Sequence, residues 1–298
     1  MKKLLIICSL LLYLNAKEFK HESTFGFLSN GTLLQNFNEG RIAFSMWIEE
    51  VASLYDSKLE VKYFSDKDEI YDEFKNKKSL DMIVIPVTYY FEHKNEIDLI
   101  ADNFWSVSIN DKKYTRYILI GRKNLKAKGF KDLQNRTIIF DDENDIPKIW
   151  LDKKSIIYNK KGYMDVVKEE FHEKKEPTIL LRVFFGKSDF GIISENTWTT
   201  MLELNPAIQN NIEIIEASKK EHFPFIGFFR KDNNNKEKVE IFFKISKNLR
   251  NFPRSEQIMN LLKFDSVFEI EKDSLKNLEK FYNEYYELKK SIKDVNTF

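Results

Sequence analysis

Cysteine is nearly absent from the sequence. The single cysteine, Cys8, lies in an apolar stretch at the start of the 298-residue chain. Without that stretch the chain can form neither disulfides nor thiolate metal sites, and it has no cysteine nucleophile. Histidine is also scarce: His21, His93, His172 and His222 are scattered, without the close spacing of a histidine metal site. We therefore expect no metal centre.

Glycine and proline are sparse as well, with 9 and 6 residues, and no low-complexity linker interrupts the chain. The sequence also lacks a P-loop, a dinucleotide-binding fingerprint and a G-x-S-x-G motif. Each of these motifs marks a common class of catalytic or cofactor site. Their absence predicts a protein that is not an enzyme, with no catalytic residues and no cofactor.

Neither sign of charge is in excess. The 48 Lys and Arg residues face 47 Asp and Glu residues, for a formal net charge of +1. Because nucleic-acid-binding proteins are usually strongly basic, we expect no nucleic-acid partner. A hydrophobic content of 42% over this length is enough for one large or two medium domains.

The N-terminus has the pattern of a secretory signal peptide. Lys2 and Lys3 precede an apolar run at residues 4–14, and the small residue Ala16 follows it. The run is too short for a stable membrane anchor. We predict a signal peptide at residues 1–16, cleaved near Ala16, and export to the periplasm.

Two similar segments organise the rest of the chain. Asp81 follows a Lys-Ser pair closely and precedes the apolar run MIVI, while Asp189 directly follows another such pair and precedes FGII. Each run has the length and composition of a buried strand. A polar and aromatic turn follows each run, where the carboxyl end of a strand holds ligands in α/β sheets. The repetition predicts two α/β lobes facing one cleft.

Hydrophobic periodicity and turn residues predict the other elements. We expect crossing strands between the lobes at residues 114–122 and 223–229. Lobe 1 is then predicted to comprise residues 17–115 and 228–298, and lobe 2 residues 116–227. Further strands are expected at 24–28, 59–64, 98–101, 136–140 and 211–215, and helices at 41–55, 65–74, 163–172, 237–250, 255–263 and 273–293.

Short motifs in a fixed order add a family resemblance. They are Gly186-Lys187-Ser188-Asp189, Trp198, Asn205-Pro206, the run 214–218 followed by Pro224, and the lead into the second lobe at 131–136. In this order the chain resembles the phosphate/phosphite/phosphonate-binding (PhnD-like) branch of type 2 periplasmic solute-binding proteins. The resemblance implies an α/β fold with two lobes, each a mixed sheet flanked by helices and joined by two crossing strands. It also implies a monomer that captures a small ligand for an ABC-type transporter.

One stretch departs from the family pattern. Oxyanion binders of this kind usually place hydroxyl and glycine residues at a helix N-terminus in the second lobe. Here the equivalent residues, Asp141 to Asp145, carry four carboxylates. Carboxylates and an oxyanion repel at close range, so we expect phosphate and simple phosphonates to bind poorly. A hard cation is the sharper interpretation of this loop, and a solvated acidic surface is the plainer one.

Four loops are predicted to contact the ligand, at residues 29–31, 86–90, 141–145 and 194–198. Glu195 could bind a ligand amine or only cap a helix. Tyr89, Tyr90 and Trp198 could form aromatic walls around a ligand or belong to the core. The candidate ligand-binding residues are Ser29, Asn30, Thr88, Tyr89, Tyr90, Asp141, Ser194, Glu195, Asn196 and Trp198.

Two kinds of membrane partner are compatible with the expected cleft. A binding protein of this architecture can deliver its ligand to a permease. The alternative is a sensory module that passes ligand occupancy to a membrane receptor or kinase. The same cleft serves both roles.

Overall fold

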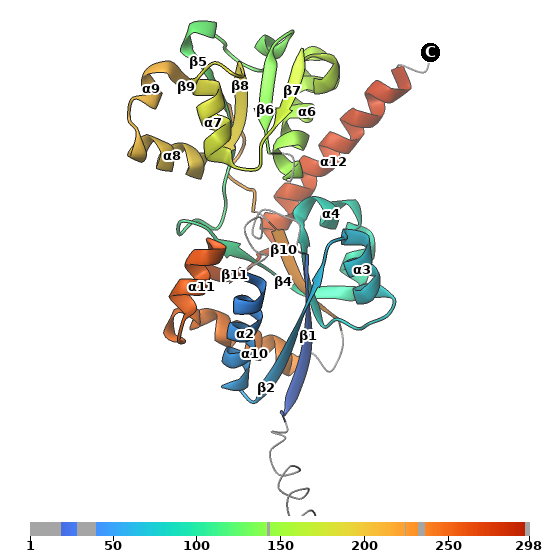
Figure 1. The fold of residues 1–298 in the computed structure, drawn as a ribbon. Coiled ribbons are helices and arrows are strands. Elements are labelled where there is room, and N and C mark those ends of the chain that lie inside the picture. The colour runs from blue at the N-terminus through green and yellow to red at the C-terminus, as the bar shows by residue number, and fades with distance from the viewer. Residues whose placement is uncertain (1–18, 29–39, 142–143, 224, 232–235, 296–298) are drawn as a thin grey trace, which may run out of the picture.

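The protein has two lobes, each built on its own sheet (Figure 1). The computed structural model describes residues 19–28, 40–141, 144–223, 225–231 and 236–295. The predicted signal peptide and the candidate residues Ser29 and Asn30 lie outside these ranges. Among the described residues, no helix is both long and apolar enough to cross a membrane.

The first lobe contains a six-stranded mixed sheet in the order β11-β4-β10-β3-β1-β2. β1 pairs in parallel with β2 and β3, whereas β10 runs antiparallel to β3 and β4. The strands are β1 (His21–Leu28), β2 (Ser57–Phe64), β3 (Met82–Pro86), β4 (Ala101–Ser108), β10 (Phe225–Arg230) and β11 (Ser266–Glu269).

Helices cover both faces of this sheet because its strands are apolar on both sides. In β3, Ile83 and Ile85 belong to one buried cluster, and Met82 and Val84 belong to another. The first cluster includes residues of α3 (Lys67–Lys75), α4 (Val87–Glu92) and α5 (Lys94–Ile100). The second includes residues of α2 (Gly40–Ser53), α10 (Lys236–Lys247) and α11 (Ser255–Leu262).

The second lobe contains a five-stranded mixed sheet in the order β7-β6-β8-β5-β9. Its strands are β5 (Tyr117–Arg122), β6 (Thr137–Phe140), β7 (Glu169–His172), β8 (Phe190–Ser194) and β9 (Ile212–Ala217). Its helices are α6 (Asp145–Asn159), α7 (Glu176–Phe184), α8 (Glu195–Leu204) and α9 (Ile208–Asn211), with short 3-10 turns at Lys123–Leu125, Phe130–Leu133 and Tyr163–Asp165.

The repeated segments fall in different lobes. The strand after Asp81 is β3 of the first sheet, and the strand after Asp189 is β8 of the second. The prediction of two separate sheets is therefore confirmed. Gly186 has a φ of +71°, the left-handed conformation expected where the helix before β8 ends.

The crossings between lobes are shorter than predicted. The segments expected to cross, 114–122 and 223–229, mostly form β5 and β10, and each strand lies inside one sheet. The chain crosses between Ser108 and Tyr117 and returns between Ala217 and Phe225. The predicted boundary between residues 227 and 228 thus falls inside β10, a strand of the first sheet.

Two local predictions were wrong. Residues 163–172, expected to be helical, form a 3-10 turn and then the edge strand β7, which pairs in parallel with β6. Residues 98–101, expected as a strand, are the end of α5 and the first residue of β4. The strand pairing of β7 is a long-range interaction, and local periodicity contains no information about it.

The C-terminal helix α12 (Lys272–Val295) links the lobes. On the first lobe, its Tyr282 stacks on Phe91 of α4, with ring centroids 4.6 Å apart. The helix then continues alongside α6 of the second lobe (Figure 1). There the buried Lys153 of α6 donates to the carbonyl oxygen of Phe281 at 2.9 Å and pairs with Glu284. The helix therefore packs on both lobes.

Candidate functional site: the cavity between the lobes

A cavity of about 670 Å³ lies between the two lobes. The first lobe contributes the end of β4 and the residues of α11 and the turn after it. The second lobe contributes the start of β5, the loop after β6, and the N-termini of α7 and α8. Thr115 and His222, one from each crossing segment, line it as well. Both crossing segments and parts of both lobes thus line this cavity.

The two crossing segments are tied together beside the cavity. The backbone N–H of Thr115 donates to the carbonyl oxygen of His222 at 2.7 Å, and the N–H of His222 donates back to Thr115 at 3.1 Å. This reciprocal pair is an isolated antiparallel bridge outside both sheets. Its position between the lobes is that of a hinge.

The loop after β6 contributes the acidic wall. Asp141 and Asn144 both line the cavity, and the Asp141 side chain is 3% exposed. The Asn144 amide donates to the Tyr117 hydroxyl at 2.7 Å, and its carbonyl oxygen caps α6 by accepting from the N–H of Ile146. Burial raises the pKa of Tyr117, and the nearby Glu176 carboxylate raises it further. The predicted acidic loop therefore borders the cavity, through its first and fourth residues.

The N-terminus of α8 holds a carboxylate of the same chain. Ser194 donates to Glu176 through its backbone N–H at 3.0 Å and through its hydroxyl at 2.5 Å. The Thr197 hydroxyl donates to the same carboxylate, while the Thr197 N–H donates to the Ser194 hydroxyl oxygen. Glu176, Ser194 and Thr197 all line the cavity. Ser194 therefore caps α8, with Glu176 bound to the same hydroxyl.

His222 is the most unusual side chain of the cavity. It is 1% exposed, and its ring lies between those of Tyr117 and Phe281, at centroid distances of 5.6 and 5.2 Å. Neither ring nitrogen has a hydrogen-bond partner among the residues that the structure describes. Burial, together with the charge of Lys153, lowers the pKa of His222 to about 3. The ring is neutral at physiological pH, with one donor and one acceptor unused.

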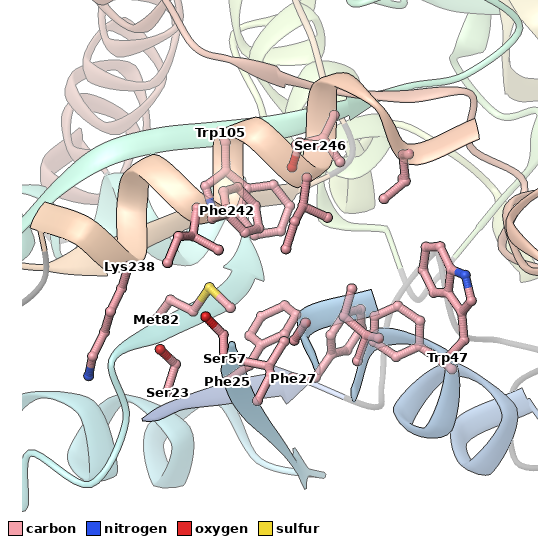
Figure 2. Close-up of a pocket in the computed structure, with 18 of the residues that line it drawn as sticks. Ser23, Phe25, Phe27, Trp47, Ser57, Met82, Trp105, Lys238, Phe242 and Ser246 are labelled. Atoms are coloured by element: carbon pink, nitrogen blue, oxygen red, sulfur yellow. The ribbon is translucent and has the colours of Figure 1, made fainter. Parts of the chain in front are cut away.

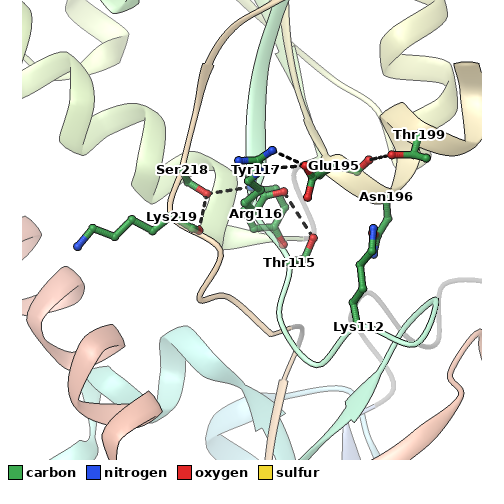
Figure 3. Close-up of polar contacts among 9 residues, drawn as sticks. All are labelled: Lys112, Thr115, Arg116, Tyr117, Glu195, Asn196, Thr199, Ser218 and Lys219. Carbon is green, nitrogen blue, oxygen red and sulfur yellow. Dashed lines mark hydrogen bonds and ion pairs between the residues drawn. The ribbon is translucent and has the colours of Figure 1, made fainter.

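The wall on the side of the first lobe mixes apolar and polar residues. The first lobe contributes the apolar Val107, Met259, Leu261, Leu262 and Phe264 with the polar Asn260, Lys263 and Asp265, and the first crossing contributes Ile109, Asn110, Lys112 and Lys113. The Lys112 ammonium donates to the side-chain oxygen of Asn196 at 3.2 Å, so this bond spans the lobes (Figure 3). Asn196 is a predicted candidate, and it lines the cavity.

Glu195 is not placed to bind a ligand amine. Its carboxylate forms an ion pair with Arg116, which donates through both Nε and Nη2 (Figure 3). Glu195 is also not among the residues that line the cavity. Its backbone N–H donates to the Arg116 carbonyl oxygen at 2.9 Å, which fixes the start of α8 on the first crossing. The Glu195 side chain is thus held by Arg116, and Ser194 rather than Glu195 supplies the side-chain cap of α8.

The aromatic candidates lie in the core. Tyr89 and Tyr90 are 2% and 1% exposed, and their hydroxyls donate to Asp68 and Asp98 at 2.8 Å. Neither lines the cavity. Trp198 is half-buried and packs against the cluster formed by β5, β8 and α7. The expected aromatic walls are wrong for the tyrosines, because α4 turns their rings toward α3 and α5 rather than toward the second lobe.

Thr88 has an inter-lobe contact instead of a cavity position. It is buried, and its hydroxyl lies 3.4 Å from the Asp145 carboxylate at the start of α6. Of the candidates within the described residues, the structure therefore brings Asp141, Ser194 and Asn196 together at the cavity. It adds three residues that the sequence did not single out: Tyr117, Glu176 and His222.

A second, smaller cavity lies inside the first lobe. It measures about 110 Å³ and is lined mainly by apolar and aromatic side chains of β1, β4, α2 and α10, including Phe25, Trp47, Trp105 and Phe242 (Figure 2). It lies within the packing between a sheet and its covering helices, whereas the larger cavity has polar groups from both lobes. The larger one is therefore the candidate ligand site. No cluster of possible metal ligands occurs in the described part of the chain.

Comparison with known proteins gives structural matches only. No family model matches the sequence, and no curated protein matches it. XAC2383 from Xanthomonas citri, solved with ATP, matches with a TM-score of 0.64 at 8% identity, covering 90% of this chain and 98% of that one. PhnD1 from Prochlorococcus marinus, solved with methylphosphonate, matches with a TM-score of 0.59 at 14% identity, covering 87% and 96%.

A third matching structure is also a phosphonate-related binding protein. The binding component of an ABC phosphonate transporter from Pseudomonas aeruginosa has a TM-score of 0.59 at 12% identity, over 91% of this chain and 88% of that one. At such low identities the likeness establishes the fold alone. The chain has the two-lobed fold of the type 2 periplasmic binding proteins, and it is PhnD-like in structure, as its motifs predicted.

Proposed function

We propose that the protein is a periplasmic solute-binding protein that captures a small ligand between its lobes and presents it to a membrane transporter. The observation that carries this proposal is the 670 Å³ cavity, which is lined by both lobes and by both crossing segments. Ligand pockets in proteins usually measure ~300–1,000 Å³. A solute that touches both walls favours the closed arrangement, because it gains contacts there that the open form cannot offer.

Two groups of the second lobe and one of the returning crossing support a polar contact with the ligand. Asp141 supplies a buried carboxylate, Asn144 an amide, and His222 a neutral ring with unused hydrogen-bonding capacity. A buried polar atom without a partner costs free energy unless something pairs with it. A bound solute that hydrogen-bonds the His222 ring would remove that cost.

The first lobe supports an apolar contact with the same ligand. Leu261 is 47% exposed at the cavity and lies on α11, beside the buried Met259 and Leu262. Covering such side chains contributes about 25 cal/mol for each Å² of apolar surface removed from water. The cavity thus suits a small amphipathic molecule, with its polar part toward Asp141 and its apolar part toward α11.

Mass spectrometry of solutes released by denaturing freshly purified protein tests the proposal. We expect one small molecule to be recovered in near-stoichiometric amount. An Asp141→Ala variant that keeps its fold should retain much less of it. A matched control, Asp265→Ala, also removes a cavity-lining carboxylate, but one from the first lobe. Equal recovery from the wild type and Asp141→Ala would remove Asp141 from the ligand site, and no recovery even after incubation with periplasmic extract would refute solute capture.

A further inference from the structure

Glu176 occupies the part of the cavity that is best suited to an anion. A helix N-terminus offers free backbone N–H groups and the positive end of the helix dipole. At α8 that position also carries two hydroxyls, those of Ser194 and Thr197. The Glu176 carboxylate accepts hydrogen bonds from the Ser194 N–H and from both hydroxyls. These are the contacts that a bound carboxylate or phosphonate would make.

The position of Glu176 is set by α7. It is the first residue of that helix and is followed by Pro177, whose fixed φ suits a first turn. Its side chain reaches across to the first turn of α8, eighteen residues further along the chain. The start of one helix thus supplies the anion for the start of the next. This arrangement fixes a negative charge at the cavity wall before any ligand enters.

A second residue of the cavity, His222, indicates which chemical group the ligand presents in place of an anion. His222 lines the same cavity, is buried, and has both ring nitrogens without a partner among the described residues. Tyr117 connects the two places: its ring lies 5.6 Å from that of His222, and it pairs with Ser194 across β5 and β8. Five lysines line the cavity as well, so the exclusion of anions is confined to the N-terminus of α8, where Glu176 already accepts the hydrogen bonds that an anion would need. The unused ring acceptor of His222 suits a donor, and Asp141 adds a carboxylate acceptor to the same cavity.

We propose that Glu176 is a built-in anion that excludes oxyanions from the N-terminus of α8, so that the cleft selects a solute carrying a hydrogen-bond donor, such as an amine, amide or hydroxyl group, which reaches Asp141 and His222. This inference rests on the proposed function and specifies its ligand class. It makes Glu176 the residue that determines specificity. The solved neighbours bound to methylphosphonate and to ATP hold anionic ligands.

Calorimetry with inorganic phosphate and with methylphosphonate tests the proposal. The wild type should show no binding at micromolar concentrations of either anion. Glu176→Ala removes the carboxylate and leaves three donors, so we expect its affinity for these anions to rise at least tenfold. Acetate should raise the melting temperature of Glu176→Ala more than that of the wild type, because it can replace the missing carboxylate.

Two variants control for charge and for folding. Glu173→Ala removes a neighbouring carboxylate that pairs with Arg182 and does not line the cavity, so it should gain no anion affinity. Glu176→Gln keeps a side chain of the same size in place without its charge, so its anion affinity should rise less than that of Glu176→Ala. It serves as the folded reference if Glu176→Ala is unstable.

The outcomes separate this inference from the proposed function. Micromolar phosphate binding by the wild type would refute the inference, as would a folded Glu176→Ala that gains no anion affinity and no stabilisation from acetate. Neither result affects solute capture, which depends on the solute recovered from the wild type. If Glu176→Ala fails to fold even with acetate or phosphate present, the carboxylate serves stability and the inference is also overturned.

Discussion

Asp81 and Asp189 make the same backbone contact in different lobes. Each precedes a central strand and accepts a hydrogen bond from the N–H of a threonine on the neighbouring parallel strand. For Asp81 the donor is Thr24 at 2.8 Å, and for Asp189 it is Thr137 at 3.1 Å. Each aspartate also lies near an arginine that ends the antiparallel neighbour, Arg230 or Arg122. The two lobes thus share one local design.

This equivalence predicts that replacing either aspartate with alanine lowers the stability of the protein by a similar amount. In Asp189→Ala the Thr137 N–H and hydroxyl lose their acceptor, and Arg122 loses its partner. We expect the free energy of unfolding to fall by about 1–3 kcal/mol. Urea denaturation checks this, and Asp81→Ala should show a loss within the same range. A loss of less than ~0.5 kcal/mol in either variant would contradict the assigned role.

His222 predicts a particular pH dependence. Its pKa is lowered to about 3 in the folded protein, from an ordinary value near 6.5, chiefly by burial. Below about pH 6.5 the unfolded chain binds a proton that the folded protein does not, so stability falls as the pH falls. Between pH 7 and pH 5 this residue should remove about 2 kcal/mol from the free energy of unfolding.

The matching control is His222→Phe, which keeps an aromatic ring between Tyr117 and Phe281 without a titrating group. Its denaturation midpoint should change less between pH 7 and pH 5 than that of the wild type. Burial raises the pKa of Glu221, which acts in the opposite direction, and the comparison between variants removes this contribution. Identical pH profiles for the two proteins would show that His222 is not buried in its neutral form.

Trp198 is expected to contribute mainly to stability. Its half-buried ring packs on the cluster of the second lobe and does not line the cavity. Trp198→Ala should destabilise the ligand-free protein by about 2 kcal/mol, less than the ~3–5 kcal/mol of a fully buried aromatic residue. Thermal denaturation of the ligand-free protein checks this. Unchanged stability with weakened ligand binding would contradict this assignment and make Trp198 a ligand contact.

Substitution of Asp152 tests the contact between α6 and α12. It is 3% exposed, and it accepts hydrogen bonds from the Tyr163 N–H and from the Tyr285 hydroxyl of α12, while Lys289 pairs with it. Asp152→Ala should cost about 2–4 kcal/mol of stability, because it leaves buried donors without an acceptor. Lys289→Ala should cost less than ~1 kcal/mol, since that lysine is partly exposed. Equal effects in urea denaturation would contradict the assigned contacts.

Sequence patterns predicted those features that depend on local chemistry. The apolar runs after Asp81 and Asp189 are central strands, as their length and composition predicted. Such features follow from the composition of a short segment.

The rest of the site depends on distant contacts. An acidic residue at a helix start, such as Glu176, is ordinary, and only the approach of α7 to α8 gives it a role. His222 carries no motif, and its burial arises from Tyr117 and Phe281, which lie 105 residues before and 59 residues after it. Tyr89 and Tyr90 follow a strand as ligand residues often do, yet their partners Asp68 and Asp98 hold them in the core.

The central claim is that the lobes close on a small solute, and a distance across the cavity tests it most directly. Since Cys8 is the only cysteine of the sequence, cysteines introduced at Leu261 and Thr200 can be spin-labelled selectively once Cys8 is replaced by serine. These residues line the cavity from opposite lobes, and both are exposed. We expect the label distance to shorten when the solute released from the wild type is added, and to stay long in an Asp141→Ala background. A single distance that no recovered solute changes would contradict closure.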